Sequence, residues 1–230
     1  MGRDSTHGSD KSHLAIRVGT CYNVVSSNQR RSQQGNVAPG MKVIEFTSTN
    51  FFPVCHEKTV LEIGPLDGRF STEILKHHPK SLTLLEASHT AIELLKSFSY
   101  QDSVKIIHGD MHRDLPLIGR VDVVIMLGII YHSHAPLYVL EEVVNVCDPD
   151  IIIIDNPGNY FNCIAEKVNV IGMRATTDNR KTSNLVITID REILVSALTN
   201  LGYKLDIELT YPVDDTFKNG NIPLYQFKKL

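Results

Sequence analysis

Short apolar runs alternate with amphipathic segments from residue 59 onward. The apolar runs are four to seven residues long, and the stretches between them have helical spacing of apolar positions. This alternation is typical of βαβ units, in which helices cover a mostly parallel sheet. It predicts an α/β fold with a doubly wound sheet. Strands are predicted at residues 59–63, 82–86, 104–108, 121–127, 150–154, 204–209 and 224–227.

Helix start and stop signals occur between these runs. Ser88 and Asp190 stand where N-caps are expected, and Pro136 suits the first turn of a helix. Pro79 and Gly202 follow stretches that they would end. Helices are predicted at residues 69–77, 89–98, 136–146 and 191–201.

The run at residues 121–127 is apolar at every position except Asp122. A strand that is exposed on one face alternates apolar and polar residues, whereas a strand covered on both faces does not. We therefore expect this run to form a strand at the centre of the sheet.

Two segments do not follow this alternation. Residues 1–55 are rich in Ser, Asn, Gln and Gly, and residues 26–36 have the composition of a mobile loop. Residues 156–185 interrupt the path from the fifth strand to the next helix. Long excursions are often lids or binding loops, although an ordinary surface insertion also fits. We divide the chain into a partly flexible N-terminal segment, 1–55, and a domain, 56–230, that contains the 156–185 insertion.

Composition narrows the class of protein. With 230 residues and 42% hydrophobic content, the chain can bury one substantial core as a single domain. Its formal charge of −3 gives no basic field for unspecific nucleic-acid binding. A local basic patch stays open, because six cations occur in the two segments outside the alternation: Arg17, Arg30, Arg31, Arg174, Arg180 and Lys181.

Cysteine spacing and apolar-run length indicate the protein's environment. Cys21, Cys55, Cys147 and Cys163 are widely spaced, without the C-x-x-C pair of a zinc or redox site. No apolar run approaches the roughly 20 residues of a membrane span, and the polar first residues lack the apolar core of a signal peptide. We expect a soluble, cytoplasmic protein with reduced, buried thiols and no membrane partner.

The stretch at residues 60–71 carries the strongest functional signal. An apolar strand containing Glu62 ends in a turn through Gly64 and Gly68, and a helix follows. Glycines allow a tight turn and close backbone approach, and a helix start offers unpaired amides. A dinucleotide fingerprint requires glycine where this chain has Leu66. The turn therefore predicts a small-ligand site and argues against a dinucleotide.

The spacing E-x-G-x-x-x-G resembles the first motif of class I S-adenosylmethionine-dependent methyltransferases. The resemblance implies a Rossmann-like fold whose seven-stranded, mostly parallel sheet ends in a C-terminal antiparallel hairpin. It also implies S-adenosylmethionine as the cofactor and S-adenosylhomocysteine as its product. Asp67 either binds the cofactor's amino-acid end or only stabilises the turn. The residues of the turn that the resemblance assigns to the cofactor site are Glu62, Gly64, Pro65, Asp67 and Gly68.

Two further acids follow the second and third predicted strands. Glu86 lies 22 residues after the first glycine of the turn, where a carboxylate can accept hydrogen bonds from both ribose hydroxyls. The adjoining Ala87 belongs to the same predicted site. The resemblance implies that Asp110 and Met111 hold the adenine. Each acid has a structural alternative, because Glu86 could cap the next helix and Asp110 could fix a turn with His112.

The loop after the central strand is the predicted place of the chemistry. Its pattern L-G-x-x-Y-H-x-x-x-P, from Leu127 to Pro136, resembles a methyltransferase subgroup that includes tRNA wobble-uridine carboxymethyltransferases and several small-molecule enzymes. Leu127 and Gly128 would contact the cofactor. An imidazole can take a proton from an oxygen or nitrogen nucleophile, so His132 is a candidate base, while Tyr131 would orient the acceptor. A histidine that only shapes the loop is the alternative.

The histidines near this loop do not predict a metal site. Their spacing fixes no coordination shell, and metal-dependent methyltransferases normally supply several carboxylates or amides. The groups considered are His108, Asp110, His112, His132 and His134.

The resulting hypothesis is an enzyme that transfers a methyl group from S-adenosylmethionine to an O or N atom of a small molecule. The N-terminal segment and the 156–185 insertion would form the acceptor pocket. An RNA-directed enzyme of the same fold requires the six cations to converge on one face. A cofactor-binding module without transferase activity is a further alternative, whereas a nicotinamide oxidoreductase is disfavoured by Leu66.

Overall fold

The computed structural model describes residues 39–100, 102–156, 173–177, 185–211 and 222–230. Several predictions concern residues outside this part of the chain. They include the loop at 26–36, Cys21, Cys163 and, among the cations, Arg17, Arg30, Arg31, Arg180 and Lys181.

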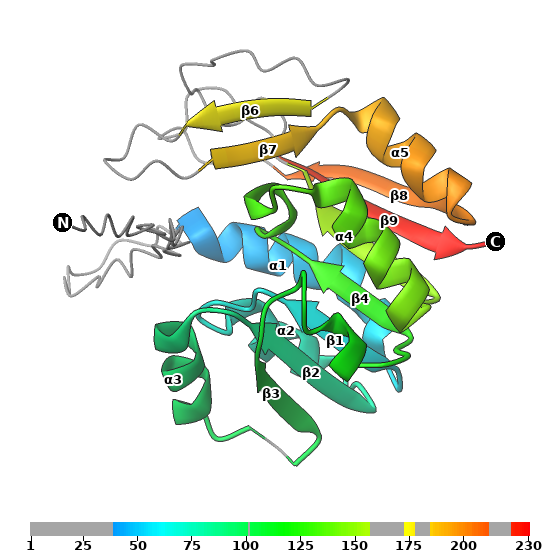
Figure 1. Ribbon diagram of the computed structural model, residues 1–230. Helices are drawn as coiled ribbons and strands as arrows, with labels where there is room; N and C mark the ends of the chain where they lie inside the picture. Colours follow the sequence, from blue (N-terminus) through cyan, green and yellow to red (C-terminus); the bar gives the residue numbers. More distant parts are fainter. Residues whose placement is uncertain (1–38, 101, 157–172, 178–184, 212–221) are drawn as a thin grey trace, which may run out of the picture.

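A seven-stranded sheet forms the centre of the molecule, in the order β3-β2-β1-β4-β5-β9-β8 (Figure 1). The first five strands of this order are parallel, and β9 runs antiparallel to both β5 and β8. The predicted doubly wound sheet with its C-terminal antiparallel hairpin is confirmed, and β4 is central as expected. The strands are β1 (Thr59–Ile63), β2 (Ser81–Glu86), β3 (Val104–His108), β4 (Val123–Met126), β5 (Ile151–Asp155), β8 (Tyr203–Tyr211) and β9 (Ile222–Lys229).

Helices cover both faces of this sheet. The longer ones are α1 (Pro39–Phe51), α2 (Arg69–Lys76), α3 (His89–Ser97), α4 (Pro136–Glu142) and α5 (Arg191–Asn200). Short turns of helix are η1 (Phe52–Cys55), η2 (Leu115–Leu117), η3 (Ile130–His132) and the π-helical η4 (Val143–Cys147). Figure 1 shows α4 in front of the sheet and α1 and α2 behind it.

Each face of the sheet buries its own apolar cluster, because successive strand residues point to opposite sides. Leu61 and Val124 pack with residues of α4 and α5 on one face. Val60, Ile125 and Ile153 pack with residues of η1, α2 and α3 on the other. A sheet buried on both faces explains why the central apolar runs lack alternation.

Elements that the sequence did not predict lie in or directly after the two unassigned segments. α1 belongs to the N-terminal segment, and its C-terminal Phe51 is fully buried in the second cluster. β6 (Met173–Thr177) lies in the insertion, and β7 (Leu185–Ile189) begins at its last residue; the two strands pair antiparallel in a separate two-stranded sheet. Asn156, directly after β5, holds this pair in place, because its amide group bonds both the carbonyl and the N–H of Ile189.

The two cysteines in the described part of the chain are buried, as predicted. Burial raises the pKa of Cys55 to about 12 and that of Cys147 to about 11, so both thiols stay protonated at neutral pH. Within the same part of the chain, the helices are all too short or too polar to cross a bilayer.

Candidate functional site

The turn after β1 requires glycine at two positions. Gly64 and Gly68 have left-handed φ values of +72° and +71°. A Cβ atom on Gly64 would lie 2.8 Å from the side chain of Ile129, and one on Gly68 would lie 2.6 Å from the hydroxyl of Tyr100. Side chains at either position would therefore be both strained and crowded, which explains the spacing of the motif.

Leu66, the departure from the dinucleotide fingerprint, occupies a position that favours glycine. Its φ is +51°, which is left-handed, and 39% of the residue is exposed. A non-glycine residue in this region carries a strain of roughly 1–2 kcal/mol. Its backbone N–H donates to the Oε2 atom of Glu86 at 3.0 Å, so the strained position is bonded to the adjacent strand.

Glu86 connects the end of β2 with the turn after β1 and with the residue that precedes α3. It ends β2, is only 1% exposed, and accepts from Leu66 N–H through Oε2 and from Ser88 N–H through Oε1, the latter at 2.7 Å. The structural alternative, a bond at the start of the next helix, is therefore present. A carboxylate has about four lone-pair sites, so these two bonds leave capacity for further donors.

Glu62 is buried within β1, with 3% exposure. Ser71 of α2 donates its hydroxyl to Glu62 Oε2 at 2.6 Å. Burial raises the pKa of Glu62 to about 7, opposed by the Ser71 bond and reinforced by the charges of Asp67 and Glu86. The group therefore holds a proton over much of the acidic range, and it ties the strand to the helix that the turn opens.

Asp67 forms an ion pair at the beginning of α2. Both of its carboxylate oxygens accept from Arg69 Nε, at 2.9 and 2.8 Å. Burial alone would raise the pKa of Asp67, but the hydrogen bonds and charge of Arg69 outweigh it and hold the pKa below its usual value. This pairing gives Asp67 a turn-stabilising role, one of the two that the sequence left open.

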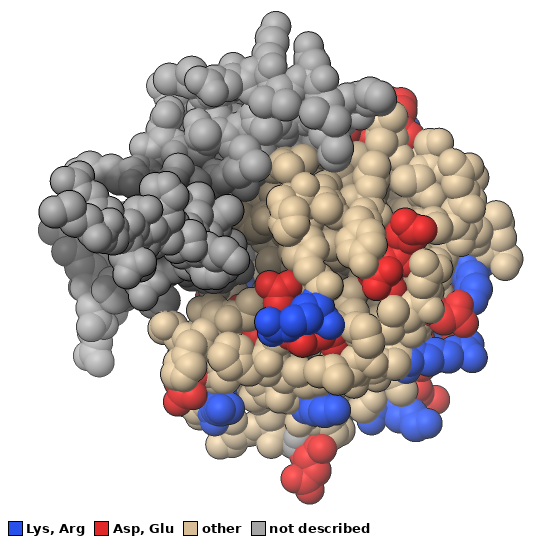
Figure 2. All heavy atoms as spheres, viewed as in Figure 1, with Lys and Arg blue, Asp and Glu red and all other residues tan. Residues whose placement is uncertain are grey.

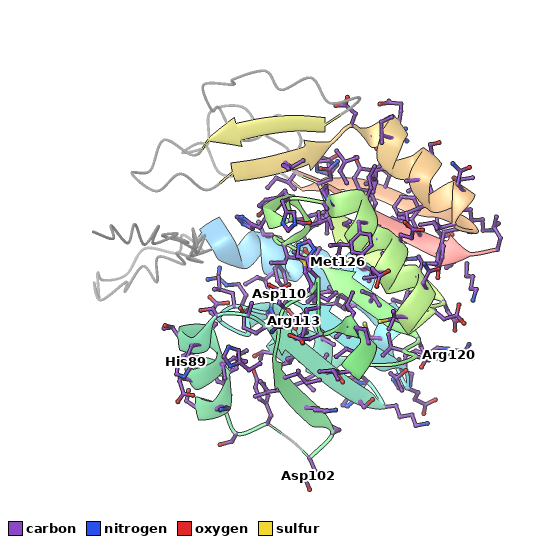
Figure 3. All side chains as sticks on the ribbon, viewed as in Figure 1. His89, Asp102, Asp110, Arg113, Arg120 and Met126 are labelled. Carbon is purple, nitrogen blue, oxygen red and sulfur yellow. The ribbon has the colours of Figure 1, made fainter. Side chains whose placement is uncertain are left out.

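Asp110 and its neighbours form a compact polar turn after β3. Asp110 Oδ1 accepts from the backbone N–H of His112 at 2.7 Å, and Asp110 N–H donates to Asp114 Oδ2 at the same distance. The Asp114 carboxylate also pairs with Arg113. Figure 3 shows Asp110 and Arg113 near the middle of the view, and Figure 2 shows acidic and basic groups intermingled there. The turn-fixing alternative for Asp110 is thus present, and Met111 packs against the core.

The loop after β4 brings Leu127, Gly128, Tyr131 and His132 to the same edge of the sheet. Gly128 is exposed, with φ +74°, and a Cβ there would lie 3.6 Å from the Tyr131 hydroxyl. The rings of Tyr131 and His132 lie 4.6 Å apart within η3, and His132 is exposed. Both predicted catalytic residues therefore stand on a short helical turn directly beyond the central strand.

Two other histidines pack together beside this loop. The rings of His112 and His134 stack with centroids 4.6 Å apart, and the hydroxyl of buried Ser133 lies 3.2 Å from His112 Nε2. Burial lowers the pKa of His112, despite the charge of Asp110. No group of three His, Cys, Asp or Glu residues suited to a metal ion occurs among the residues that the structure describes.

A cavity of about 240 Å³ opens at the carboxyl ends of β4 and β5. Three predicted site residues, Leu127, Gly128 and Tyr131, line it, whereas Glu86 and His132 are not among its lining residues. Other walls come from α1, the start of α2, β5 and β9. The remaining lining residues are Val43, Ile44, Thr47, Arg69, Phe70, Asp155, Ile222 and Leu224.

Asp155 is the lining residue that the sequence analysis missed and that carries the clearest chemistry. It ends β5, is 5% exposed, and accepts from Gly128 N–H through Oδ1 at 2.9 Å. Burial raises its pKa to about 7, against the lowering effect of the Gly128 bond. The sequence feature that could have identified Asp155 is a carboxylate at the end of a buried apolar strand, as at Glu86.

Comparison with known proteins agrees with this geometry. A family model described as a methyltransferase domain matches residues 61–154. This match covers less than half of the chain. The matched region runs from β1 to β5, so it includes the glycine turn, both predicted acids and the loop after β4.

Solved structures share the fold at low sequence identity. An S-adenosylmethionine-dependent methyltransferase from Mesorhizobium loti superposes with a TM-score of 0.62 and 11% identity, over 84% of this chain and 98% of that chain. A Synechocystis magnesium protoporphyrin IX methyltransferase with bound S-adenosylmethionine gives 0.59 and 10%, over 86% and 87%. The Burkholderia thailandensis 1,6-didemethyltoxoflavin-N1-methyltransferase, with 1,6-didemethyltoxoflavin and S-adenosylhomocysteine bound, gives 0.59 and 13%, over 86% and 93%. The predicted methyltransferase fold is confirmed.

Curated relatives include the subgroup that the Tyr-His loop resembles. A tRNA U34 carboxymethyltransferase from Helicobacter pylori is 29% identical in an alignment of 121 residues. The alignment covers 46% of this chain and 45% of the relative. The same enzyme from a second strain is 28% identical over the same length. The chain spans less than half the length of these relatives, and the resemblance to this subgroup is confirmed.

Proposed function

We propose that this protein is an S-adenosylmethionine-dependent methyltransferase that acts on an O or N atom of a small molecule. The observation that supports it best is the arrangement along one edge of the sheet. The glycine turn after β1, the buried Glu86 after β2 and the loop after β4 occupy this edge, and the cavity opens beside that loop. Ligands of open α/β sheets bind at the carboxyl ends of the strands.

The chain's own residues fit this cofactor. Gly64 and Gly68 allow the tight turn after β1, and the exposed Gly128 leaves open backbone surface that a side chain would cover. Glu86 keeps lone pairs for ribose hydroxyls, and Asp110 keeps one carboxylate oxygen beyond its bond to His112. The remaining residues that we assign to the cofactor site are Glu62, Pro65, Asp67, Ala87, Met111 and Leu127.

The protein's part in the reaction is mainly alignment. When bound, S-adenosylmethionine supplies a methyl group on a positively charged sulfur, and that sulfur is the leaving group when the acceptor atom attacks the methyl carbon in line. Holding two reactants in this geometry accounts for a large part of catalysis in such displacements. Tyr131 lines the cavity and would orient the acceptor, and His132 would take the acceptor's proton where the acceptor is not already anionic.

Segments outside the matched region would form the acceptor side of the site. Val43, Ile44 and Thr47 of α1 line the cavity, so part of the N-terminal segment already contributes to its wall. Asn156, the first residue of the insertion, bonds Ile189 just after its last residue, so the insertion begins and ends beside the carboxyl end of β5. These contacts support a substrate-side role for residues 1–55 and 156–185.

An acceptor in tRNA is the second candidate. The support for it is the similarity to the H. pylori tRNA U34 carboxymethyltransferases, at 28–29% identity over 121 residues. The cations that an RNA-binding face would use are mostly outside the described residues.

The first experiment is calorimetric titration of the full chain with S-adenosylmethionine, S-adenosylhomocysteine and NAD. Binding of both sulfur compounds without NAD is expected. Glu86→Ala should weaken the affinity severalfold or more, because it removes the proposed ribose acceptor, and Glu86→Gln should have a smaller effect. The control is Glu93→Ala, at an exposed position of α3.

Each outcome of this titration has a distinct meaning. Absence of binding to either sulfur compound would contradict the proposed function as a whole. Unchanged affinity in folded Glu86→Ala would remove only the ribose assignment. Binding without methyl transfer to any compound in an acceptor screen would instead favour a cofactor-binding module.

A further inference from the structure

Asp155 places an ionisable group in the wall of the cavity. It follows Ile154, which pairs with Met126 of β4, so its position lies beside the beginning of the loop that carries Gly128 and Tyr131. One oxygen, Oδ1, accepts from Gly128 N–H at 2.9 Å. That bond fixes the orientation of the carboxyl group and leaves Oδ2 available to a ligand.

The rest of the described wall is mainly apolar. Besides the phenol ring of Tyr131, six of its side chains are hydrocarbon or aromatic: Val43, Ile44, Phe70, Leu127, Ile222 and Leu224. Two polar members already have partners, because the Thr47 hydroxyl donates to Val43 O at 2.8 Å and Arg69 is paired with Asp67. Among the described lining residues, Asp155 alone supplies a carboxyl group.

The carboxyl oxygen of Asp155 that Gly128 does not use can accept from a further donor. A ligand with a hydrogen-bond donor would gain that bond in a mainly apolar cavity, where it is stronger than in water. The raised pKa of Asp155, about 7, is consistent with this poorly solvated position. A site built to bond a donor rejects analogues that lack it, so the group would act on selectivity more than on rate.

We propose that Asp155 is a specificity residue, which binds an N–H or O–H donor of the acceptor through the carboxyl oxygen that Gly128 does not use. The acceptor class that follows is a compact molecule with an apolar body and one such donor. This inference rests on the proposed function, because it assigns the cavity to the acceptor.

The substitution Asp155→Asn tests this assignment sharply. The asparagine carbonyl oxygen can still accept from Gly128 N–H, which fixes the side-chain orientation, while an NH₂ donor replaces the free oxygen. The variant therefore reverses the hydrogen-bonding polarity that the cavity presents, with little change of volume. The matched control is Asp102→Asn, because Asp102 is exposed in the loop before β3 and points away from the molecule in Figure 3.

The probes are three pairs of small aromatic molecules that differ in one donor: indole and 1-methylindole, benzimidazole and 1-methylbenzimidazole, phenol and anisole. Each is titrated by ligand-observed NMR, at about pH 8.5 where a carboxyl group with a pKa of about 7 is ionised, into the full chain saturated with S-adenosylhomocysteine. We expect the donor member to bind the unaltered protein about tenfold more tightly than its methylated partner, as one buried hydrogen bond allows. Asp155→Asn should abolish that preference, and Asp102→Asn should retain it.

Three results would overturn the proposal: equal affinity of both members for the unaltered protein, a preference that survives in Asp155→Asn, or no binding of any pair. Thermal unfolding and S-adenosylhomocysteine affinity show whether the variant is folded. If S-adenosylhomocysteine fails to bind the unaltered protein, the proposed function fails. The same titrations on the cofactor-free chain then still test whether Asp155 selects donors.

Discussion

At the scale of single residues, Glu62 links the folding of the cofactor edge to pH. Burial raises its pKa from 4.5 to about 7, while Ser71 supplies its one hydroxyl partner. The folded protein therefore binds a proton that the unfolded chain has already lost between these two pH values. The stabilisation from this group is fully present below about pH 4.5 and is lost as the pH rises through about 7.

Glu62→Gln removes this titration while keeping an oxygen that can accept from Ser71. Between pH 4.5 and 8, the free energy of unfolding of the variant should rise relative to the unaltered protein by roughly 3 kcal/mol, the equivalent of the shift in pKa. Urea unfolding of both proteins at several pH values measures this difference. The other titrating groups are the same in both proteins, so their contributions cancel. Exposed Glu93→Gln should show no such trend. A difference that stays constant with pH would contradict a shifted Glu62.

Individual site residues were predictable only where the sequence shows their position relative to a strand end or a motif. Gly64, Gly68 and Glu86 follow from strand ends and spacing, and the structure places them together. Asp155 was missed because its role depends on the cavity around it, whose walls come from α1, β4 and β9. The left-handed backbone of Leu66 was also hidden, since the identity of the residue argues against that conformation.

At the scale of elements, the strands were the best-predicted part of the fold. A sheet covered on both faces imposes continuous apolar runs, which is a local signal. α1 was not predicted, because its second half, with Thr47, Ser48, Thr49 and Asn50, has weak helix propensity. It is held by packing that the chain makes elsewhere, with Phe51 buried beside α2 and β1. The pairing of β6 with β7 is likewise set by contacts distant in sequence.

Asn156 bonds the end of β7 to the chain directly after β5. Its amide satisfies both backbone groups of Ile189 in a buried position, so Asn156→Ala should lower the free energy of unfolding by about 1–3 kcal/mol. Urea unfolding measures this loss, and hydrogen exchange should show faster exchange of the Ile189 amide. The control is Asn145→Ala, at an exposed position of η4. Equal losses in the two variants would show that the bonds to Ile189 contribute nothing particular.

At the scale of the whole molecule, charge bears on the choice between the two acceptor classes. The chain carries 26 acidic and 23 basic side chains, for a formal charge of −3. On the face shown in Figure 2, acidic and basic groups lie close to one another where the described surface carries charge. Unspecific affinity for nucleic acid comes mainly from cations that neutralise phosphates, so a formal charge of −3 favours a small acceptor.

The affinity of the full chain for tRNA measures that balance directly. In 150 mM salt we expect a dissociation constant for bulk tRNA weaker than about 10 µM, because few phosphates would be neutralised at once. Fluorescence anisotropy with labelled tRNA, with and without S-adenosylhomocysteine, gives the value, and repetition in 50 mM salt gives the salt dependence. Submicromolar binding that weakens steeply with salt would contradict the prediction. It would also favour tRNA as the acceptor, because the cations outside the described residues would then converge on the nucleic acid.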